Sequence, residues 1–111
     1  MNEPLGHAVG NSVEVIEAIK FLKGDYQRDL KDVTFELAIQ TLIKTGKSEN
    51  RDSAVKLLDR VLESGEALQK FKDLIISQSG DVSVIEDYSK FPQAKNIIEI
   101  KAEKSVQLLQ I

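Results

Sequence analysis

The sequence predicts a mainly α fold, in which about four helices are followed by one or two C-terminal β-strands. Apolar residues recur at helical spacing over residues 12–79, and the runs are separated by Gly24, Gly46 and Gly65. Apolar and polar residues alternate over residues 96–102, which is typical of a half-buried strand. With 111 residues, the chain is one small domain or a piece of a larger one.

The first helix is expected at about residues 12–23. Its apolar stripe consists of Val13, Ile16, Ile19 and Leu22. Asn11 or Ser12 can cap its start, and Gly24 ends it by adopting the left-handed conformation of a helix C-terminus. Glu17 lies in the first turns, where an acidic side chain interacts favourably with the helix dipole. That placement explains Glu17 without a ligand.

The second helix is expected at about residues 30–44 and has two apolar faces. One face consists of Phe35, Ala38, Ile39, Leu42 and Ile43, and the other of Leu30, Val33 and Leu37. Because a helix that is apolar on two sides is packed on two sides, we expect this helix to be the centre of the core.

A polar break that contains Gly46 leads to the third helix, for which Ser48 and Asn50 are candidate caps. The apolar positions of the third helix are Ala54, Leu57, Leu58, Val61 and Leu62. Gly65 bends the chain, and a fourth helix then runs to Gly80. Its apolar positions are Ala67, Leu68, Phe71, Leu74 and Ile75.

The pattern changes after the fourth helix. Residues 81–87 are compatible with one short capped turn, and the Phe91-Pro92 pair stops any helix. We expect one strand at residues 96–102 and a second at residues 105–111. The two residues between them are poor hairpin formers, so the strands need partners that the sequence does not include. Their unpaired edges predict self-association through the C-terminal third, and hence a homo-oligomer.

Composition narrows the class of partners and the compartment. The net charge is −3 and acidic and basic residues alternate, which argues against binding to nucleic acid or a membrane surface. The chain has no cysteine, in keeping with a reducing compartment, and no apolar run of about 20 residues that could span a membrane. We therefore expect a cytoplasmic protein.

Residues 1–19 are the most informative about function. Pro4, Gly6 and Gly10 form a tight loop that leads directly into the first helix. A helix N-terminus attracts anions, but the glycine spacing fits neither GxGxxG nor GxxxxGK[ST], which disfavours a nucleotide phosphate. The second possibility is a cation held by loop carbonyls and Glu17, and a single carboxylate favours a monovalent ion. The third is that the glycines only shape a turn and Glu17 is a solvated acid.

The loop MNEPLGHAVGN, followed by an acidic amphipathic helix, resembles the PLGxAxGN signature of pyrimidine-nucleoside and thymidine phosphorylases. The resemblance continues through EVIEAIKFLKG, SGEALQKFKDLIISQSGD and FPQAK, so it covers nearly the whole chain in register. It implies that residues 1–95 are the helical part of the family's α/β domain. Residues 96–111 would then lead into a truncated C-terminal domain.

In this family, the resemblance implies, the loop binds a potassium ion through the backbone carbonyls of Leu5 and Ala8 and the carboxylate of Glu17. The implied reaction is the reversible phosphorolysis of a pyrimidine nucleoside to the free base and a pentose 1-phosphate. The partners are therefore the nucleoside and phosphate, and the groups that bind them lie upstream of this segment. The chain is accordingly expected to be a fragment that has no catalytic residues of its own.

Three positions and two alternatives qualify this interpretation. His7 occupies a variable position of the signature and is expected to be an exposed loop residue, while Ser79 and Val106 replace glycines that are usual in the family. The first alternative is a free-standing, non-catalytic helical interaction module derived from the family. The second is kinship with anthranilate phosphoribosyltransferases, which have a related helical architecture but a diphosphate motif that is absent here.

Overall fold

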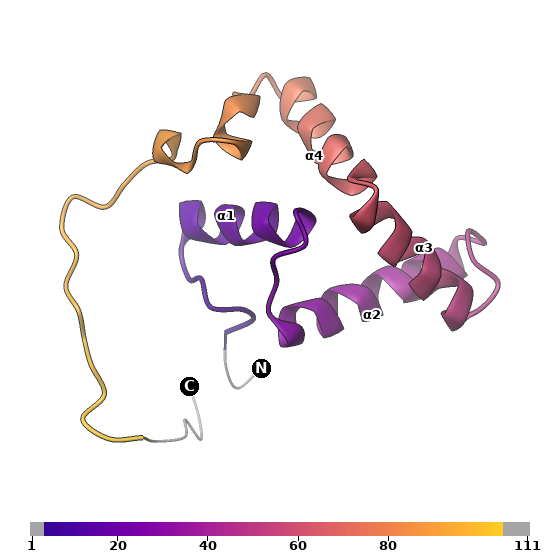
Figure 1. Ribbon diagram of the computed structural model, residues 1–111, viewed down its shortest axis with the longest axis horizontal. Coiled ribbons are helices and arrows are strands. Elements are labelled where there is room, and N and C mark those ends of the chain that lie inside the picture. The colour runs from indigo at the N-terminus through magenta and orange to yellow at the C-terminus, as the bar shows by residue number, and fades with distance from the viewer. Residues whose placement is uncertain (1–3, 106–111) are drawn as a thin grey trace.

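The computed structural model describes residues 4–105 and contains four α-helices in that range (Figure 1). The elements are α1 (Asn11–Leu22), α2 (Arg28–Lys44), α3 (Arg51–Glu63), α4 (Glu66–Ser77) and the short 3-10 helices η1 (Val82–Ile85) and η2 (Tyr88–Lys90). The four predicted helices are thus present, close to the expected bounds. None of the helices in the described part of the chain is long and apolar enough to cross a membrane.

The start of α3 shows how local sequence sets a helix boundary. The side chain of Asn50 accepts a hydrogen bond from the Ser53 N–H at 3.0 Å, and the Ser53 hydroxyl lies 3.3 Å from the Asn50 N–H. This reciprocal pair satisfies two backbone donors that a helix N-terminus leaves free. Of the two predicted caps, Asn50 is therefore the one used. At the other end of α3, Gly65 is left-handed, with φ +77°, and separates α3 from α4.

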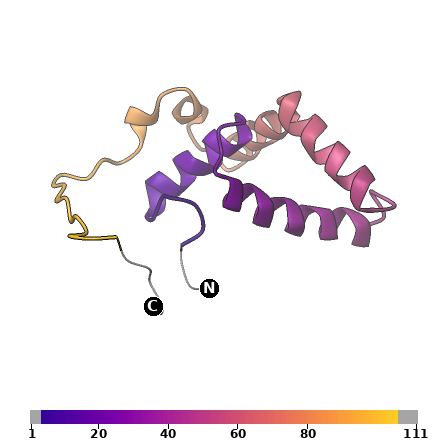
Figure 2. The same cartoon turned by 60° about the horizontal axis from the view of Figure 1, so that its bottom comes forward.

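The hydrophobic core lies where α1, α2 and α3 meet. Its buried members are Phe21, Phe35, Ile39 and Ala54, and half-buried side chains such as Tyr26, Leu42 and Leu58 pack around them. The helices α2 and α3 contact each other more than any other pair, beside the connection that joins them (Figure 2). The first predicted face of α2 therefore forms the core.

The prediction that α2 is packed on two sides is wrong. Val33 and Leu37 on the second face are 44% and 66% exposed, because no element of residues 4–105 covers them. Leu30, at the start of the same strip, does pack against the core.

After α4 the chain turns back and packs against α1 and α4. Ile85 is completely buried, and its carbonyl accepts a hydrogen bond from Lys23 Nζ at 2.5 Å. Glu86 pairs with Lys23 at 3.7 Å and with Lys72 at 3.1 Å, so two helices share one carboxylate. The single predicted turn is in fact two consecutive 3-10 turns, capped by Asp81 and Asp87. Hydrogen bonds from serine hydroxyls, and then from serine N–H groups, lower the pKa of both aspartates.

The prediction of C-terminal β-strands is wrong for residues 96–105. Residues 91–105 follow the helices as an extended chain without strand pairing (Figure 1). Ile97, Ile98 and Ile100 are 85%, 84% and 94% exposed. Alternation supplies two faces, but a strand also needs a neighbour for its backbone hydrogen bonds, and none lies in the described range. Residues 106–111, most of the second expected strand, lie outside the described residues.

Candidate functional site

The loop formed by residues 4–10 turns at two glycines before it enters α1. Gly6 has φ +70° and Gly10 has φ +137°, both in the region that side-chain-bearing residues rarely adopt. Gly10, rather than the expected Asn11 or Ser12, occupies the cap position. Its N–H donates to Glu14 Oε1 at 3.1 Å, and its carbonyl accepts from the Glu14 N–H at 2.9 Å. These bonds fix the end of the loop to the first turn of α1.

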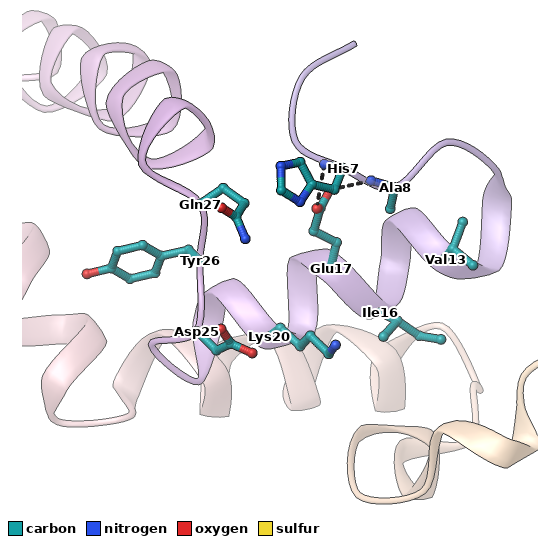
Figure 3. Close-up of a pocket in the computed structure, with 9 residues that line it drawn as sticks. All are labelled: His7, Ala8, Val13, Ile16, Glu17, Lys20, Asp25, Tyr26 and Gln27. Atoms are coloured by element: carbon teal, nitrogen blue, oxygen red, sulfur yellow. Dashed lines mark hydrogen bonds between the residues drawn. The ribbon is translucent and has the colours of Figure 1, made fainter. Parts of the chain in front are cut away.

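The carboxylate of Glu17, on the next turn of α1, accepts hydrogen bonds from the backbone in the middle of the same loop. The His7 N–H donates to Oε1 at 2.9 Å, and the Ala8 N–H donates to Oε2 at 3.4 Å (Figure 3). Glu17 is half-buried. It is therefore not the solvated surface acid of the simplest interpretation, because both of its oxygens face the loop.

The backbone at Gly6 lies directly against this carboxylate. A Cβ atom added at Gly6 would stand 2.4 Å from Glu17 Oε2 and 2.8 Å from its Cδ, distances that Cβ atoms essentially never show. The positive φ at position 6 therefore favours glycine, and a side chain there would displace the end of the Glu17 side chain.

The structure thus brings Glu17 to the loop that carries Leu5 and Ala8, the three residues of the predicted cation site. Within residues 4–105, no group of three or more His, Cys, Asp or Glu side chains could hold a metal ion. A cation at this loop would therefore depend on one carboxylate and on backbone oxygens, and hard cations prefer such oxygen ligands. The side chain of Leu5 lines an apolar groove together with Val9, Phe21 and Phe71.

A pocket of about 350 Å³ opens beside Glu17, between the loop, α1 and the connection to α2 (Figure 3). It is lined by His7, Ala8, Val13, Ile16, Glu17, Lys20, Asp25, Tyr26 and Gln27. His7 is exposed, as predicted for a loop residue, and contributes its backbone N–H to the Glu17 contact. Sequence reasoning did not find Asp25 and Gln27, because the α1–α2 connection carries no periodicity or motif that marks them.

Comparison with known proteins gives matches to curated enzymes but to no family model. The pyrimidine-nucleoside phosphorylase of Bacillus subtilis (strain 168) is 41% identical over 105 residues, which are 95% of this chain and 24% of that protein. The enzyme of the same name from Staphylococcus aureus (strain bovine RF122 / ET3-1) is 44% identical over 105 residues, with the same coverage of both chains. This sequence matches a segment of the pyrimidine-nucleoside phosphorylase family.

The match to pyrimidine-nucleoside phosphorylases confirms the resemblance that the PLGHAVGN loop indicated. The protein of that name from Geobacillus stearothermophilus is 39% identical over all 111 residues, which are 26% of its length. The chain therefore spans about a quarter of the length of the curated relatives it matches.

Proposed function

We propose that this chain is a segment of a pyrimidine-nucleoside phosphorylase that acts in the cytoplasm. In the complete protein, an oxygen of phosphate would form a bond to the anomeric carbon of the pentose while the bond to the pyrimidine nitrogen breaks. The products would be the free base and a pentose 1-phosphate. The similarity to three phosphorylases, over 95% or more of this chain, supports the assignment.

We assign to this segment a structural part in that activity, namely a loop that holds a potassium ion. The ligands would be the backbone carbonyls of Leu5 and Ala8 and the carboxylate of Glu17. The observation that carries the assignment is the position of Glu17, whose carboxylate lies against the loop that carries Leu5 and Ala8, 2.9 and 3.4 Å from the His7 and Ala8 amides. A bound ion would add a positive charge beside this carboxylate. Glu14 and Glu17 also make the start of α1 unfavourable for phosphate, because two carboxylates repel an anion.

The test is a Glu17→Gln variant of the complete phosphorylase, assayed over a range of potassium concentrations at constant ionic strength. A hydrogen bond or ion contact to a charged group contributes about 1.5–3 kcal/mol, so the potassium concentration for half-maximal activity should rise about tenfold or more. Glu14→Gln is the matched control, since Glu14 lies in the same part of α1 and its carboxylate accepts a hydrogen bond from the Gly10 N–H. Equal potassium dependence of Glu17→Gln and the unmodified enzyme would contradict the assignment.

The second candidate function is a non-catalytic helical interaction module derived from the same family. Exposed apolar side chains on two helices favour it, since Leu37, Leu74 and Ile76 are 66%, 54% and 61% exposed and a partner could cover them. Intact-mass measurement of the protein from its source cells separates the two candidates. A species of 12.4 kDa supports the module, and a species about four times larger supports the phosphorylase.

A further inference from the structure

We propose that Gly6 is a positioning residue for Glu17, and that the two residues form a clamp that closes the loop without a bound ion. The clamp is defined here as the Gly6 backbone, the His7 and Ala8 N–H groups and the Glu17 carboxylate. Its consequence for ion binding rests on the proposed potassium site. The clamp itself rests only on the geometry of residues 4–17.

The contacts of the Glu17 carboxylate are those of a closed loop. Its two oxygens accept from consecutive backbone N–H groups, those of His7 and Ala8. A Cβ at Gly6 would stand 2.4 Å from Oε2, so a side chain at position 6 would displace the carboxylate. Two residues further along α1, Ile19 is completely buried, which anchors the part of the helix that carries Glu17. The loop is therefore hydrogen-bonded to a carboxylate on an anchored helix.

The clamp leaves the carboxylate able to bind a cation. An ionised carboxylate has about four lone-pair positions, and the two amides occupy two of them. The other two positions are not used by these amides. We infer that the site is pre-organised, so that potassium binds an already ordered loop and no ordering cost is incurred at that step.

The chain offers a matched control for the role of Gly6. Gly46 has the same φ of +70°, but a Cβ added there would meet nothing within 4 Å. Alanine at position 46 therefore introduces the backbone strain alone, whereas alanine at position 6 introduces the strain and the collision with Glu17. A difference between Gly6→Ala and Gly46→Ala in the loop reports the local strain and the collision together, and the same comparison in a Glu17→Ala background removes the collision.

The experiment measures solvent exchange of the His7 and Ala8 amides by NMR on the 111-residue chain, first in potassium-free buffer. We expect both amides to exchange slowly in the unmodified chain, and the His7 amide to exchange about tenfold faster in Gly6→Ala, which loses a hydrogen bond to a charged group. Gly46→Ala should leave both rates unchanged. In a Glu17→Ala background, Gly6→Ala should add nothing further, because the carboxylate that it collides with is gone.

Potassium titration of the same samples, with choline chloride as the ionic-strength control, links the clamp to the ion. We expect potassium to shift the His7 and Ala8 resonances of the unmodified chain and of Gly46→Ala, with weaker binding by Gly6→Ala. Equal amide exchange in Gly6→Ala and Gly46→Ala would overturn the clamp, as would protection that develops only when potassium is added. Slow exchange in potassium-free buffer together with no potassium-dependent shift would support the clamp and overturn the proposed potassium site.

Discussion

The carboxylate of Glu86 is shared by two lysines from different helices. Lys72 Nζ lies 3.1 Å from Oε1, and Lys23 Nζ lies 3.7 Å from Oε2. The hydrogen bond from Lys72, and then the charge of Lys23, hold the pKa of Glu86 below its ordinary value of 4.5. Because Glu86 is 67% exposed, each pair is weak, yet together they connect η1 to α1 and α4.

A Glu86→Gln substitution should make the stability of the chain less dependent on acid. The pKa of Glu86 is lower in the folded state than in the unfolded state, so its stabilising contribution is present above a pH of about 4.5 and is lost as the pH falls through the folded-state pKa. The unmodified chain should therefore have the higher melting temperature near pH 7, and the difference should shrink below about pH 4. Thermal unfolding followed by circular dichroism measures this.

Glu99→Gln is the control for that measurement, because Glu99 pairs at 3.0 Å with Lys101 in the extended segment and connects no helices. It should leave the melting temperature unchanged at every pH. A melting-temperature difference between Glu86→Gln and the unmodified chain that stays constant down to about pH 3 would contradict the role assigned to Glu86.

At the residue scale, the sequence identified Glu17 but not what it contacts. Its place in the signature and on α1 marked it as a candidate ligand. Its hydrogen bonds to the His7 and Ala8 amides depend on the path of the loop backbone, which residue types do not specify. The close approach at Gly6 is a property of the folded loop for the same reason.

At the scale of elements, predictions mostly succeeded where the determinants are local, although Gly10 and not Asn11 or Ser12 caps α1. Helix ends at Gly24, Gly46 and Gly65 and the cap at Asn50 follow from the conformations that single residues prefer. The prediction of a strand at residues 96–102 was wrong because a strand is stabilised by hydrogen bonds to another strand, and no such strand lies among residues 4–105. The prediction that the second face of α2 is buried was wrong for the same reason. An apolar strip on a helix is buried only if another element packs against it.

The two faces of α2 should differ sharply in their contribution to stability. Ile39 is 2% exposed, and truncation to alanine should lower the free energy of unfolding by about 2–5 kcal/mol through lost burial and a residual cavity. Leu37, two residues away on the same helix, is 66% exposed, and Leu37→Ala should change it by about 0.5 kcal/mol or less. Urea unfolding of both variants measures the difference, and equal losses would contradict the observed packing of α2.

At the scale of the whole molecule, the described structure is thin and open. Its extents are 49 × 38 × 20 Å and its radius of gyration is 17.0 Å, against about 13 Å for a compact domain of this length. Among residues 4–105, the buried apolar side chains are Ile19, Phe21, Phe35, Ile39, Ala54 and Ile85. Large apolar side chains on several elements remain in contact with water as a result.

Self-association is the expected outcome of this exposure, and the three isoleucines at positions 97, 98 and 100 should contribute most to it. They are 84% to 94% exposed and lie within four consecutive residues, and exposed apolar side chains that cluster in this way favour association. Replacing all three with serine should lower the weight-average mass measured by light scattering at high protein concentration. The control replaces Gln93, Asn96 and Lys101 with serine, which removes no apolar side chain from the same segment. A monodisperse monomer for the unmodified chain would contradict this prediction.

The short axis of 20 Å has a thermodynamic consequence of its own. A helix with its side chains is about 10–12 Å across, so the molecule is roughly two helices thick along this axis. Almost every atom therefore lies within about one helix diameter of bulk water. Unfolding of such a thin molecule exposes less additional apolar surface to water than unfolding of a compact domain of the same mass. The heat-capacity increment per residue should therefore fall below the usual value of about 12–15 cal/mol/K, which makes stability vary unusually little between cold and warm conditions.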